Sequence, residues 1–532
     1  YIEVTDMKIS PSKLVKKTVL EVKWYIAGQI LFSAISSLFL SIIPALNRYF
    51  VDNVLMNKGN IAVFIVVYVC CYVFHLATIW ISERFVWKSA ISFENSLKKK
   101  CFEKLLNMPY KLFSKKQNGE YLSLLSNNVT RVEQDYLQPI CALVKSIIAI
   151  IIYAILIYIN TTPIICISLI MLSALASVSP LIYKRRLKET NKKYVDQVAD
   201  YTKDLEDMLD SFDMRDSKSA VAFARENGKI TDKVSSKRNR FGKTKVNSNI
   251  VSGIAVYMVD IAIMILSVVL CIHGKITIGI VLAAITYSHS LMDPIQEVLY
   301  DINTLNSSKD IVRSLDEIVD RAGSCQGGSR IEPVSWIQLN NVNVKFGNRT
   351  LTYQCKFQIG KKYLITGKSG FGKTTLTKII FGFHEYNGDV LIDGRPGTVS
   401  ADACALCSQN QHVFHANFID NVSLFGAYPF DENDRLLGAI PLYHKIRRTE
   451  DCSTLSGGEK QILKICRALV QDKSIIFMDE PFAGLDEKNA EELFVLLTSV
   501  HRTIILISHS YNFHAQLLEK WEHINIEEIC HG

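Results

Sequence analysis

Residues 362–374 read KYLITGKSGFGKT, and this stretch decides the fold of the second half of the chain. The apolar run KYLI predicts a buried strand, and TLTKIIFGF, which follows Thr374, predicts a helix. Between them, GKSGFGKT fits the pattern G-x-x-x-x-G-K-[ST] in the strand–loop–helix order of a phosphate-binding loop. The backbone N–H groups of such a loop surround phosphates at the positive end of the following helix. The residues that we expect to bind a nucleotide here are Gly367, Lys368, Ser369, Gly370, Phe371, Gly372, Lys373, Thr374 and Thr375.

Two adjacent carboxylates follow a second apolar strand further along the chain. The stretch SIIFMDEP places Asp479 and Glu480 at the end of this strand. In a P-loop NTPase, the strand-end aspartate and the Ser or Thr hydroxyl of the loop, here that of Thr374, hold Mg²⁺ together. The second carboxylate, Glu480, would act as the general base that polarises the attacking water. The alternative, a solvated acidic turn, is disfavoured by the phosphate-binding loop upstream.

Residues 453–461, STLSGGEKQ, have the character of a second anion-binding loop. The two adjacent glycines allow a close approach of backbone N–H groups to a ligand, and the helical run ILKICRALV follows. The order of all these motifs resembles that of the nucleotide-binding domain of an ABC ATPase, and STLSGGEKQ resembles the signature motif of that family. The resemblance implies ATP as the nucleotide, Mg²⁺ as its metal, and hydrolysis to ADP and phosphate.

The resemblance also implies roles for single residues. Gln409, in CSQNQHVF, fits the Q-loop residue that contacts Mg²⁺, and His509, in ILISHS, fits the switch histidine that contacts the γ-phosphate. Phe346, in VNVKFG, fits the aromatic residue that stacks on adenine, although a core position is its structural alternative. Asp486 ends the stretch AGLD, which fits the D-loop. The expected catalytic residues are thus Glu480, His509 and Gln409, and the expected Mg²⁺ ligands are Thr374, Gln409 and Asp479.

In this family two nucleotide-binding domains face each other head-to-tail, and the signature motif of one covers the ATP held by the P-loop of the other. The resemblance therefore implies that Ser456, Gly457 and Gly458 bind the nucleotide of a partner, either a second copy of this chain or a similar half. The helix that begins near Glu459 would direct its positive end at the γ-phosphate. The stretch 409–455 is shorter than in most exporters of the family, so we expect a reduced helical subdomain.

The first part of the chain is too apolar for an ordinary globular domain. Of the 532 residues, 48% are hydrophobic and 21% are charged, and the mean hydropathy of +0.15 favours a membrane portion. Lys and Arg gather in two long links of helical pattern, residues 82–139 and 183–249, which the positive-inside rule places in the cytoplasm. The net charge of +8 therefore calls for no nucleic-acid partner. Six apolar runs have about the 20 residues that a spanning helix needs: residues 25–46, 61–81, 140–159, 163–182, 250–272 and 276–291.

The Gly/Ser-rich stretch DRAGSCQGGSRIE, residues 320–332, is the best candidate for a domain boundary. We predict a transmembrane domain over 1–320 with six helices and two long intracellular loops, a linker over 321–332, and an ABC nucleotide-binding domain over 333–532. The first 320 residues resemble the exporter-type (type IV) ABC membrane domain. The expected fold is an α-helical six-span transmembrane domain followed by an α/β P-loop ATPase domain with a largely parallel sheet.

The motifs and the apolar runs together predict an ATP-driven exporter half-transporter. Such a protein dimerises and moves its cargo across the lipid bilayer by alternating access; the cargo classes are peptides, drug-like molecules and amphipathic small molecules. We expect a multi-pass protein of a bacterial plasma membrane with a cytoplasmic nucleotide-binding domain. The six apolar runs with positively charged links argue strongly against a soluble ABC ATPase of DNA repair or translation. An importer on an exporter-like fold, as some siderophore systems use, remains an alternative.

Polar side chains inside apolar helices are costly and mark candidate cargo contacts. Asp260, His75 and His289 fall near the middle of their runs, and Tyr287 is a neighbour. Our hypothesis is that Asp260, His75 and His289 line a cavity for a polar or cationic cargo. The alternative is that these groups only form hydrogen bonds between helices. Thirteen scattered cysteines fit a reducing compartment, and Cys404 and Cys407 form a C-x-x-C that packing explains better than redox or metal chemistry.

Overall fold

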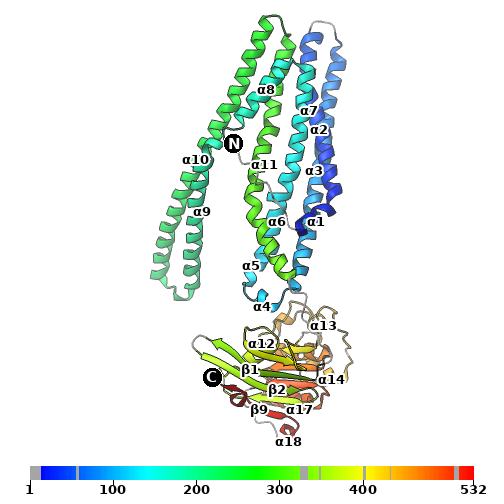
Figure 1. The fold of residues 1–532 in the computed structure, drawn as a ribbon, viewed down its shortest axis with the longest axis vertical. Coiled ribbons are helices and arrows are strands. Elements are labelled where there is room, and N and C mark those ends of the chain that lie inside the picture. Colours follow the sequence, from blue (N-terminus) through cyan, green and yellow to red (C-terminus); the bar gives the residue numbers. More distant parts are fainter. Residues whose placement is uncertain are drawn as a thin grey trace. The chain divides into compact units, whose positions relative to one another are not determined.

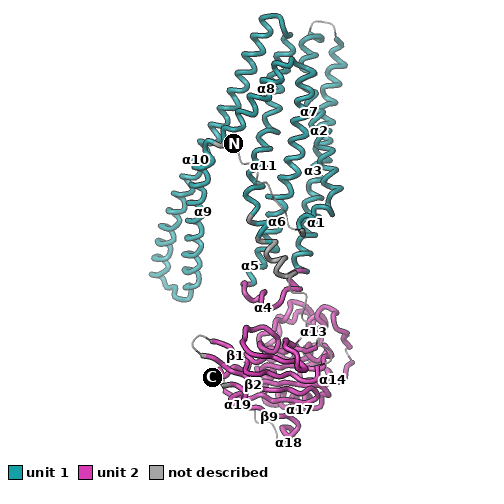
Figure 2. The backbone as a smooth tube through the Cα atoms, viewed as in Figure 1, with its two compact units in different colours: residues 1–103, 118–319 teal, residues 104–117, 320–532 magenta. Residues whose placement is uncertain are grey.

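The computed structural model describes residues 13–55, 59–323, 334–346, 349–368, 370–399, 403–431, 433–508 and 515–531. The chain divides into two compact units, which Figure 2 draws in different colours. Unit 1 comprises residues 1–103 and 118–319, and unit 2 comprises residues 104–117 and 320–532. Each unit has its own buried core. Of the linker predicted over 321–332, the part from residue 324 onward lies outside the described residues.

The described residues of unit 1 form helices only, and the long ones run as extended rods in Figure 1. The core of the unit is apolar, with small side chains such as Ala283 and Ala284 that are fully buried and allow helices to approach closely. The elements of unit 1 are α1 (Lys13–Glu21), α2 (Lys23–Tyr49), η2 (Phe50–Val54), α3 (Ile61–Leu106), α5 (Asn118–Ser123), η3 (Leu124–Asn128), α6 (Val129–Val132), η4 (Glu133–Leu137), α7 (Gln138–Asn160), α8 (Pro163–Ala176), α9 (Leu181–Asp210), η5 (Phe212–Met214), α10 (Ser217–Ile272) and α11 (Ile278–Gly323).

Five helical stretches of the described residues are long and apolar enough to cross a membrane, at the places of five of the six predicted runs. The sixth prediction, residues 163–182, is divided: α8 has 14 residues, a turn follows, and α9 begins at Leu181. Pro180 explains the division, because proline has no N–H to donate to the preceding turn and its ring disfavours a continuous helix. The apolar run is therefore present as predicted, but not as one straight helix.

The second long link forms a helical hairpin. α9 and the first part of α10 lie side by side in Figure 1, and the rings of Tyr194 and Phe241 stack at 6.2 Å between them. The Asp216 side chain caps α10 by accepting the backbone N–H groups of Lys218 and Ser219. The helical pattern predicted for residues 183–249 is confirmed.

The described residues of unit 2 form two five-stranded sheets and short helices. One sheet is antiparallel, with the order β10-β2-β1-β4-β5, and the other is parallel, with the order β6-β7-β8-β3-β9. The strands are β1 (Trp336–Phe346), β2 (Arg349–Gln358), β3 (Lys362–Thr366), β4 (Asn387–Ile392), β5 (Arg395–Pro396), β6 (Cys404–Cys407), β7 (Ile475–Asp479), β8 (Thr503–Ile507), β9 (Glu522–Asn525) and β10 (Cys530–His531). The helices are α4 (Tyr110–Phe113), α12 (Lys373–Ile380), α13 (Phe418–Ser423), α14 (Arg435–Gly438), α15 (Tyr443–Ile446), η6 (Cys452–Thr454), α16 (Gly457–Val470), α17 (Glu487–Ser499), α18 (Ala515–Leu518) and α19 (Ile526–Ile529).

Strands β6, β7, β8 and β3 of the parallel sheet are buried on both faces, which is why they read as apolar runs, whereas the edge strand β9 is more exposed and more polar. Along β7, Phe477 packs into the core cluster on one face and Met478 into the cluster on the other. The two cysteines of β6 divide in the same way: Cys404 and Cys407 belong to opposite clusters. Burial raises the pKa of both thiols, to about 12 for Cys407. The C-x-x-C motif is therefore a pair of packing residues that face apart.

Candidate nucleotide-binding site

The phosphate-binding loop follows β3 and leads into α12, as predicted. Two of its glycines are required by the surrounding chain. Gly367 has φ +140° and a Cβ there would collide with the side chain of Ile526; Gly372 has φ +85° and a Cβ would collide with the Tyr353 hydroxyl. That hydroxyl donates to the Gly372 carbonyl at 2.9 Å. The loop is thus pressed against β2 and α19, and its backbone conformation is fixed before any ligand arrives.

Lys373 is buried at the start of α12, where its ammonium donates to the carbonyl oxygen of Gly367 at 2.5 Å and to that of Lys368 at 3.3 Å. Burial lowers the pKa of Lys373, while the nearby carboxylates of Glu480 and Asp479 act in the opposite direction. A charged donor is therefore held in the middle of the loop. Lys368, Phe371 and Thr374 are exposed on the loop, and Ser369 lies outside the described residues.

The strand-end carboxylates lie at the same edge of the parallel sheet as the loop. β3 and β7 both flank β8, with Ile365 and Asp479 each opposite Ile507, so the loop after β3 and the end of β7 meet at the carboxyl edge. Asp479 is buried. Glu480 is half-buried at φ +55°, a conformation uncommon outside glycine, and its N–H donates to the Ile507 carbonyl at 2.9 Å. The backbone thereby turns the Glu480 side chain out of the strand at this edge.

Gln409 lies two residues beyond β6, the strand next to β7, and is exposed. Together with Thr374 and Asp479 it offers a hydroxyl, an amide and a carboxylate oxygen, which is the all-oxygen donor chemistry that Mg²⁺ prefers. The described residues contain no cluster of three or more His, Cys, Asp or Glu side chains that would hold a metal by themselves. The donor set fits an ion that is bound jointly with nucleotide phosphates. Phe346 ends β1 with its backbone opposite Arg349, and His509 lies outside the described residues.

The signature motif forms the N-terminus of α16. Ser456 caps the helix in a capping box, in which its hydroxyl accepts from Glu459 N–H and the Glu459 carboxylate accepts from Ser456 N–H. Lys445, at 2.6 Å, and Ser456 lower the pKa of Glu459 to about 2. Gly458 packs so closely on the Gly484 carbonyl of the D-loop that a Cβ would collide with it.

Gly457 differs from its neighbour, because a Cβ there would meet nothing within 4 Å and its φ is not in the left-handed region. Nothing in the described part of this chain requires a glycine at this exposed position. Asp486, the last residue of the D-loop, caps α17 by accepting the Asn489 N–H at 2.8 Å. The signature motif therefore has an open face beside Gly457, and the D-loop supports it from the other side.

Three polar residues of α16 that the sequence did not single out connect the signature helix to the rest of the site. Gln461 donates to the Glu480 carbonyl at 3.3 Å, Lys464 to the Gln409 carbonyl at 2.5 Å, and Arg467 to the His412 carbonyl at 2.8 Å. All three are buried. The spacing of three residues places them on one face of the helix. This row of polar residues in an otherwise apolar run is the sequence pattern from which their role could have been predicted.

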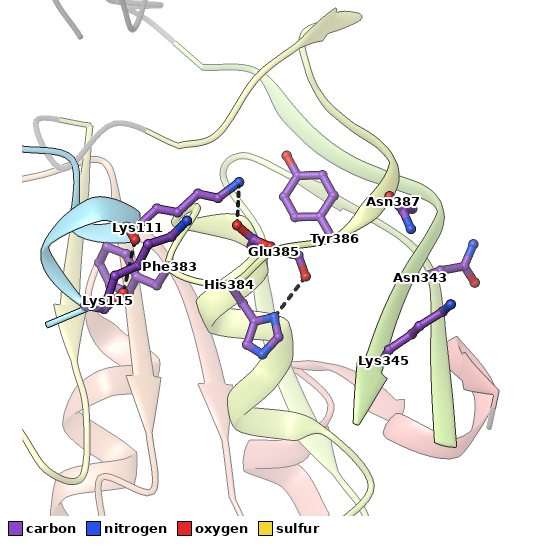
Figure 3. A pocket seen from close by; sticks show the side chains of 10 residues that line it. Lys111, Lys115, Asn343, Lys345, Phe383, His384, Glu385, Tyr386 and Asn387 are labelled. Atoms are coloured by element: carbon purple, nitrogen blue, oxygen red, sulfur yellow. Dashed lines mark hydrogen bonds and ion pairs between the residues drawn. The ribbon is translucent and has the colours of Figure 1, made fainter. Parts of the chain in front are cut away.

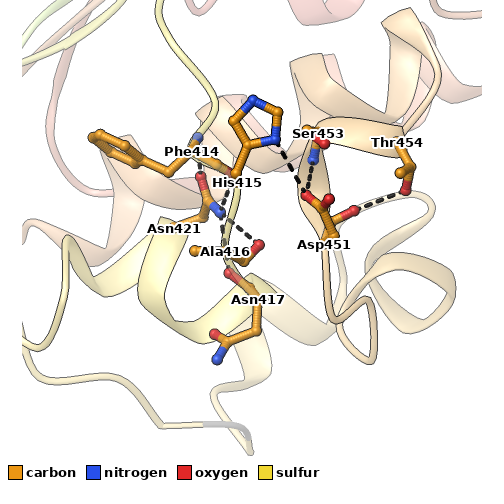
Figure 4. A network of polar contacts seen from close by, with 8 residues as sticks. All are labelled: Phe414, His415, Ala416, Asn417, Asn421, Asp451, Ser453 and Thr454. Atoms are coloured by element: carbon orange, nitrogen blue, oxygen red, sulfur yellow. Dashed lines mark hydrogen bonds and ion pairs between the residues drawn. The ribbon is translucent and has the colours of Figure 1, made fainter.

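Asn421 is the centre of a polar network, part of which Figure 4 shows, and Arg467 (which that figure does not draw) also donates to it. The Asn421 carboxamide accepts from Arg467 at 2.9 Å and from Phe414 N–H, and it donates to the carbonyls of Phe414 and Ala416. The Ala416 carbonyl also accepts from Cys452 N–H, just before the signature motif. The short stretch between Gln409 and the signature motif is thus held by buried side chains.

The Lys464→Met variant should lose the hydrogen bond from α16 to the Gln409 carbonyl of the Q-loop, while the volume of the side chain stays similar. A hydrogen bond from a charged donor contributes about 1.5–3 kcal/mol. We expect kcat for ATP hydrolysis to fall roughly ten-fold, with a higher half-saturating Mg²⁺ concentration and unchanged binding of Mg²⁺-free ATP. Lys361→Met, at an exposed lysine of the same unit, is the control. An unchanged Mg²⁺ dependence would show that Lys464 does not position Gln409.

A hollow of about 680 Å³ lies elsewhere in unit 2, where residues of the stretch 104–117 contact the segment between α12 and β4 (Figure 3). The Lys111 ammonium pairs with Glu385 at 3.1 Å, and the ring of Tyr110 contacts that of Phe383 at 4.3 Å. Lys111 lowers the pKa of Glu385, which is fully exposed. These contacts hold part of the first intracellular loop within the nucleotide-binding unit. Lys345, which precedes Phe346 in the chain, lines the same hollow.

The four predicted cargo residues do not form one site. His75 and His289 line the same cavity of about 490 Å³ in unit 1, but Asp260 and Tyr287 do not line it. Tyr287 is buried and donates to the Ser41 carbonyl at 3.1 Å, and Asp260 accepts from Ser288 and lies 3.5 Å from His289. Consecutive residues of a helix point about 100° apart, so residues 287–289 of α11 face three directions. Of the three residues placed in a cavity by the hypothesis, His75 and His289 line this one, whereas Asp260 lies beside His289 without lining it. A role of these residues and of Tyr287 in cargo binding stays a prediction.

Family comparisons identify this combination of a helical membrane unit and a P-loop unit. Residues 26–295 match the ABC transporter transmembrane region, and residues 352–483 match the ABC transporter family model. The first match alone covers half of the chain. The protein is an ATP-driven membrane transporter by class, and it belongs to the ABC transporter family, as half of an exporter-type transporter with one membrane domain and one ATPase domain.

Individual relatives agree with this assignment. The chain is 24% identical over 476 residues to the ATP-dependent lipid A-core flippase of Shigella sonnei (strain Ss046), covering 82% of this chain and 78% of the relative. It is 23% identical over 476 residues, with the same coverage, to the protein of that name from Escherichia coli (strain K12). A solved bacterial Atm1-family ABC exporter with ATP bound has the same fold, with a TM-score of 0.71 at 15% identity over 95% of this chain and 93% of that one. The predictions of an exporter-type fold, of ATPase activity and of a multi-pass membrane protein are confirmed.

Proposed function

We propose that two copies of this chain form an exporter in which each P-loop and the signature motif of the other copy enclose one ATP. The observation that carries the proposal is the open face at Gly457. Among the described residues, none lies within 4 Å of a Cβ added at Gly457, and this open space at the N-terminus of a helix of 14 residues leaves room for a phosphate from outside the chain. The dimer supplies that phosphate from the P-loop of the second copy.

Within each site the residues divide the work. Lys373 and the loop N–H groups bind the β- and γ-phosphates. Thr374, Gln409 and Asp479 would hold Mg²⁺, which would supply positive charge against the phosphate oxygens. Glu480 accepts a proton from the attacking water, and His509 contacts the γ-phosphate. Phe346 stacks on the adenine. Binding of two ATP molecules draws the nucleotide-binding units of the two copies together, and hydrolysis lets them separate. The membrane helices thereby alternate between inward and outward access.

Export is favoured over import by the place of the cavity in unit 1. Lys145 lies near the start of α7, and Glu83 and Glu297 lie beyond the ends of the apolar runs 61–81 and 276–291. All these ends are cytoplasmic by the positive-inside rule, so cargo would enter from the cytoplasm. Peptides, drug-like molecules and amphipathic small molecules remain the cargo classes.

The direction of transport can be measured in sealed vesicles. A cargo found by its stimulation of ATP hydrolysis in nanodiscs should accumulate inside vesicles whose nucleotide-binding units face the bath, and only with ATP and Mg²⁺ present. The Glu480→Gln variant, expected to bind ATP without hydrolysing it, is the control. ATP-dependent loss of cargo from such vesicles would instead establish the importer alternative.

A further inference from the structure

The cavity in unit 1 has a charge pattern that the apolar runs concealed. Four helices contribute to it: α2, α3, α7 and α11. Its ionisable lining residues are His75, Glu83, Lys145, His289, Asp293 and Glu297. With neutral histidines, three carboxylates face one ammonium, so the cavity is acidic. Its volume of about 490 Å³ is in the range of sites that hold small molecules.

The carboxylates are not neutralised by the chain itself. In the described part of the chain, Glu83, Asp293 and Glu297 have no ion-pair partner, and Lys145 forms no ion pair with any of them. Glu297 accepts a hydrogen bond from Ser146 at 2.5 Å, which orients the carboxylate but leaves its charge in place. These carboxylates lie at the cytoplasmic ends of the apolar runs, and a cavity lined by charges of one sign raises the local concentration of molecules of the opposite charge. We therefore interpret these carboxylates as the lining of a pathway for the cargo.

Hydroxyl groups complete the lining. Ser33, Ser36, Ser37, Ser82, Ser146 and Ser290 all face the cavity. Some are engaged with neighbours: Ser36 shares a hydrogen bond of 2.9 Å with the His75 ring, and Ser33 one of 2.7 Å with Ser82. The rings and aliphatic carbons of Leu40, Ile79 and Tyr153 supply an apolar side. The wall is therefore acidic, rich in small hydrogen-bonding groups, and apolar in part.

We infer that the cargo of this transporter is a positively charged amphipathic molecule, such as an amine or guanidinium compound or a cationic peptide segment, whose charge is held by Glu83, Asp293 and Glu297. The inference rests on the proposed function, because it assigns a cargo class to the export cavity. Asp260, by contrast, fixes His289 and Ser288 from α10 and acts only as a positioning residue. An anionic cargo would meet three carboxylates and one ammonium, and is disfavoured.

The test uses two dyes of similar framework and opposite charge, the cation rhodamine 123 and the anion fluorescein. Their binding to the full-length dimer in nanodiscs is measured without nucleotide by fluorescence polarisation, so that the result does not depend on ATP hydrolysis. We expect rhodamine 123 to bind at least ten-fold more tightly than fluorescein. The triple variant Glu83→Gln, Asp293→Asn, Glu297→Gln should lose at least five-fold of this preference.

The matched control is Glu226→Gln, which removes an exposed carboxylate near the start of α10, outside the cavity lining, and should keep the full preference. Equal binding of the two dyes by the unmodified protein, or an unchanged preference in the triple variant, would overturn the inference. A normal preference in a protein that hydrolyses ATP but accumulates no cargo would instead count against the proposed export function. Circular dichroism of each variant confirms that the helices are intact.

Discussion

The Glu480→Gln variant is expected to bind ATP as the unmodified protein does and to hydrolyse it at least about one hundred times more slowly, because a general base contributes about 10²–10⁴-fold to such a reaction. The amide keeps the size of the side chain, and the positive φ of residue 480 is equally demanding for Glu and Gln. The Ile507 carbonyl and Gln461 hold only the backbone of Glu480, so these contacts persist in the variant. The substitution thus removes the carboxylate and little else.

The rate is measured as phosphate release by the dimer in nanodiscs, and ATP affinity by equilibrium binding at low temperature. Glu492→Gln, at an exposed glutamate of α17, makes the same chemical change outside the site and should hydrolyse ATP normally. If Glu480→Gln retained most of the activity, another group would have to activate the water, and the assigned role of Glu480 would be lost.

The second large effect concerns the sharing of sites between two copies. Homodimers of Lys373→Ala lack the phosphate-binding ammonium, and homodimers of Gly457→Asp carry a carboxylate where the partner's phosphate should lie; each should retain no more than about 1% of the activity. A Cβ at Gly457 meets nothing within 4 Å, so the Gly457→Asp chain should fold normally. The loss of activity in Gly457→Asp would then come only from the contact between its carboxylate and the phosphate bound by the second chain.

Mixing the two variants distinguishes shared sites from separate ones. In a mixed dimer one site carries both defects and the other carries neither. Random pairing makes half of the dimers mixed, so up to about a quarter of the activity should return. Gly438→Asp, at another glycine with open space and ordinary φ, is the control for the substitution itself. Absence of recovery in dimers shown to be mixed would contradict the head-to-tail arrangement.

The nucleotide-binding unit was the easier half to predict, for a physical reason. Phosphate loops and strand-end carboxylates are local in sequence, and a parallel sheet brings them to one edge wherever its strands lie. Gly367, Lys373 and Asp479 could therefore be placed from motifs alone. Lys464 and Arg467 could not, because they donate mainly to backbone carbonyls that are distant in the sequence, and every residue type has a backbone carbonyl.

The membrane unit was harder, because the rotation of each helix about its axis is set by packing. Tyr287 and His289 stand two positions apart, yet one is buried against α2 and the other faces the cavity. Glu83, Asp293 and Glu297 were overlooked because they fall just past the ends of the apolar runs, whereas the search considered polar groups inside them. The break at Pro180 likewise follows from a single residue within an otherwise spanning run.

Gln461 has a further consequence. Its helix begins with the signature motif, which in the proposed dimer touches the ATP of the other copy, while its amide holds the backbone of this copy's own base. If α16 tilts when its signature motif binds the ATP of the other copy, the Gln461 side chain transmits that movement to the backbone of Glu480. Nucleotide at one site would then raise the rate of hydrolysis at the other site without being required for it.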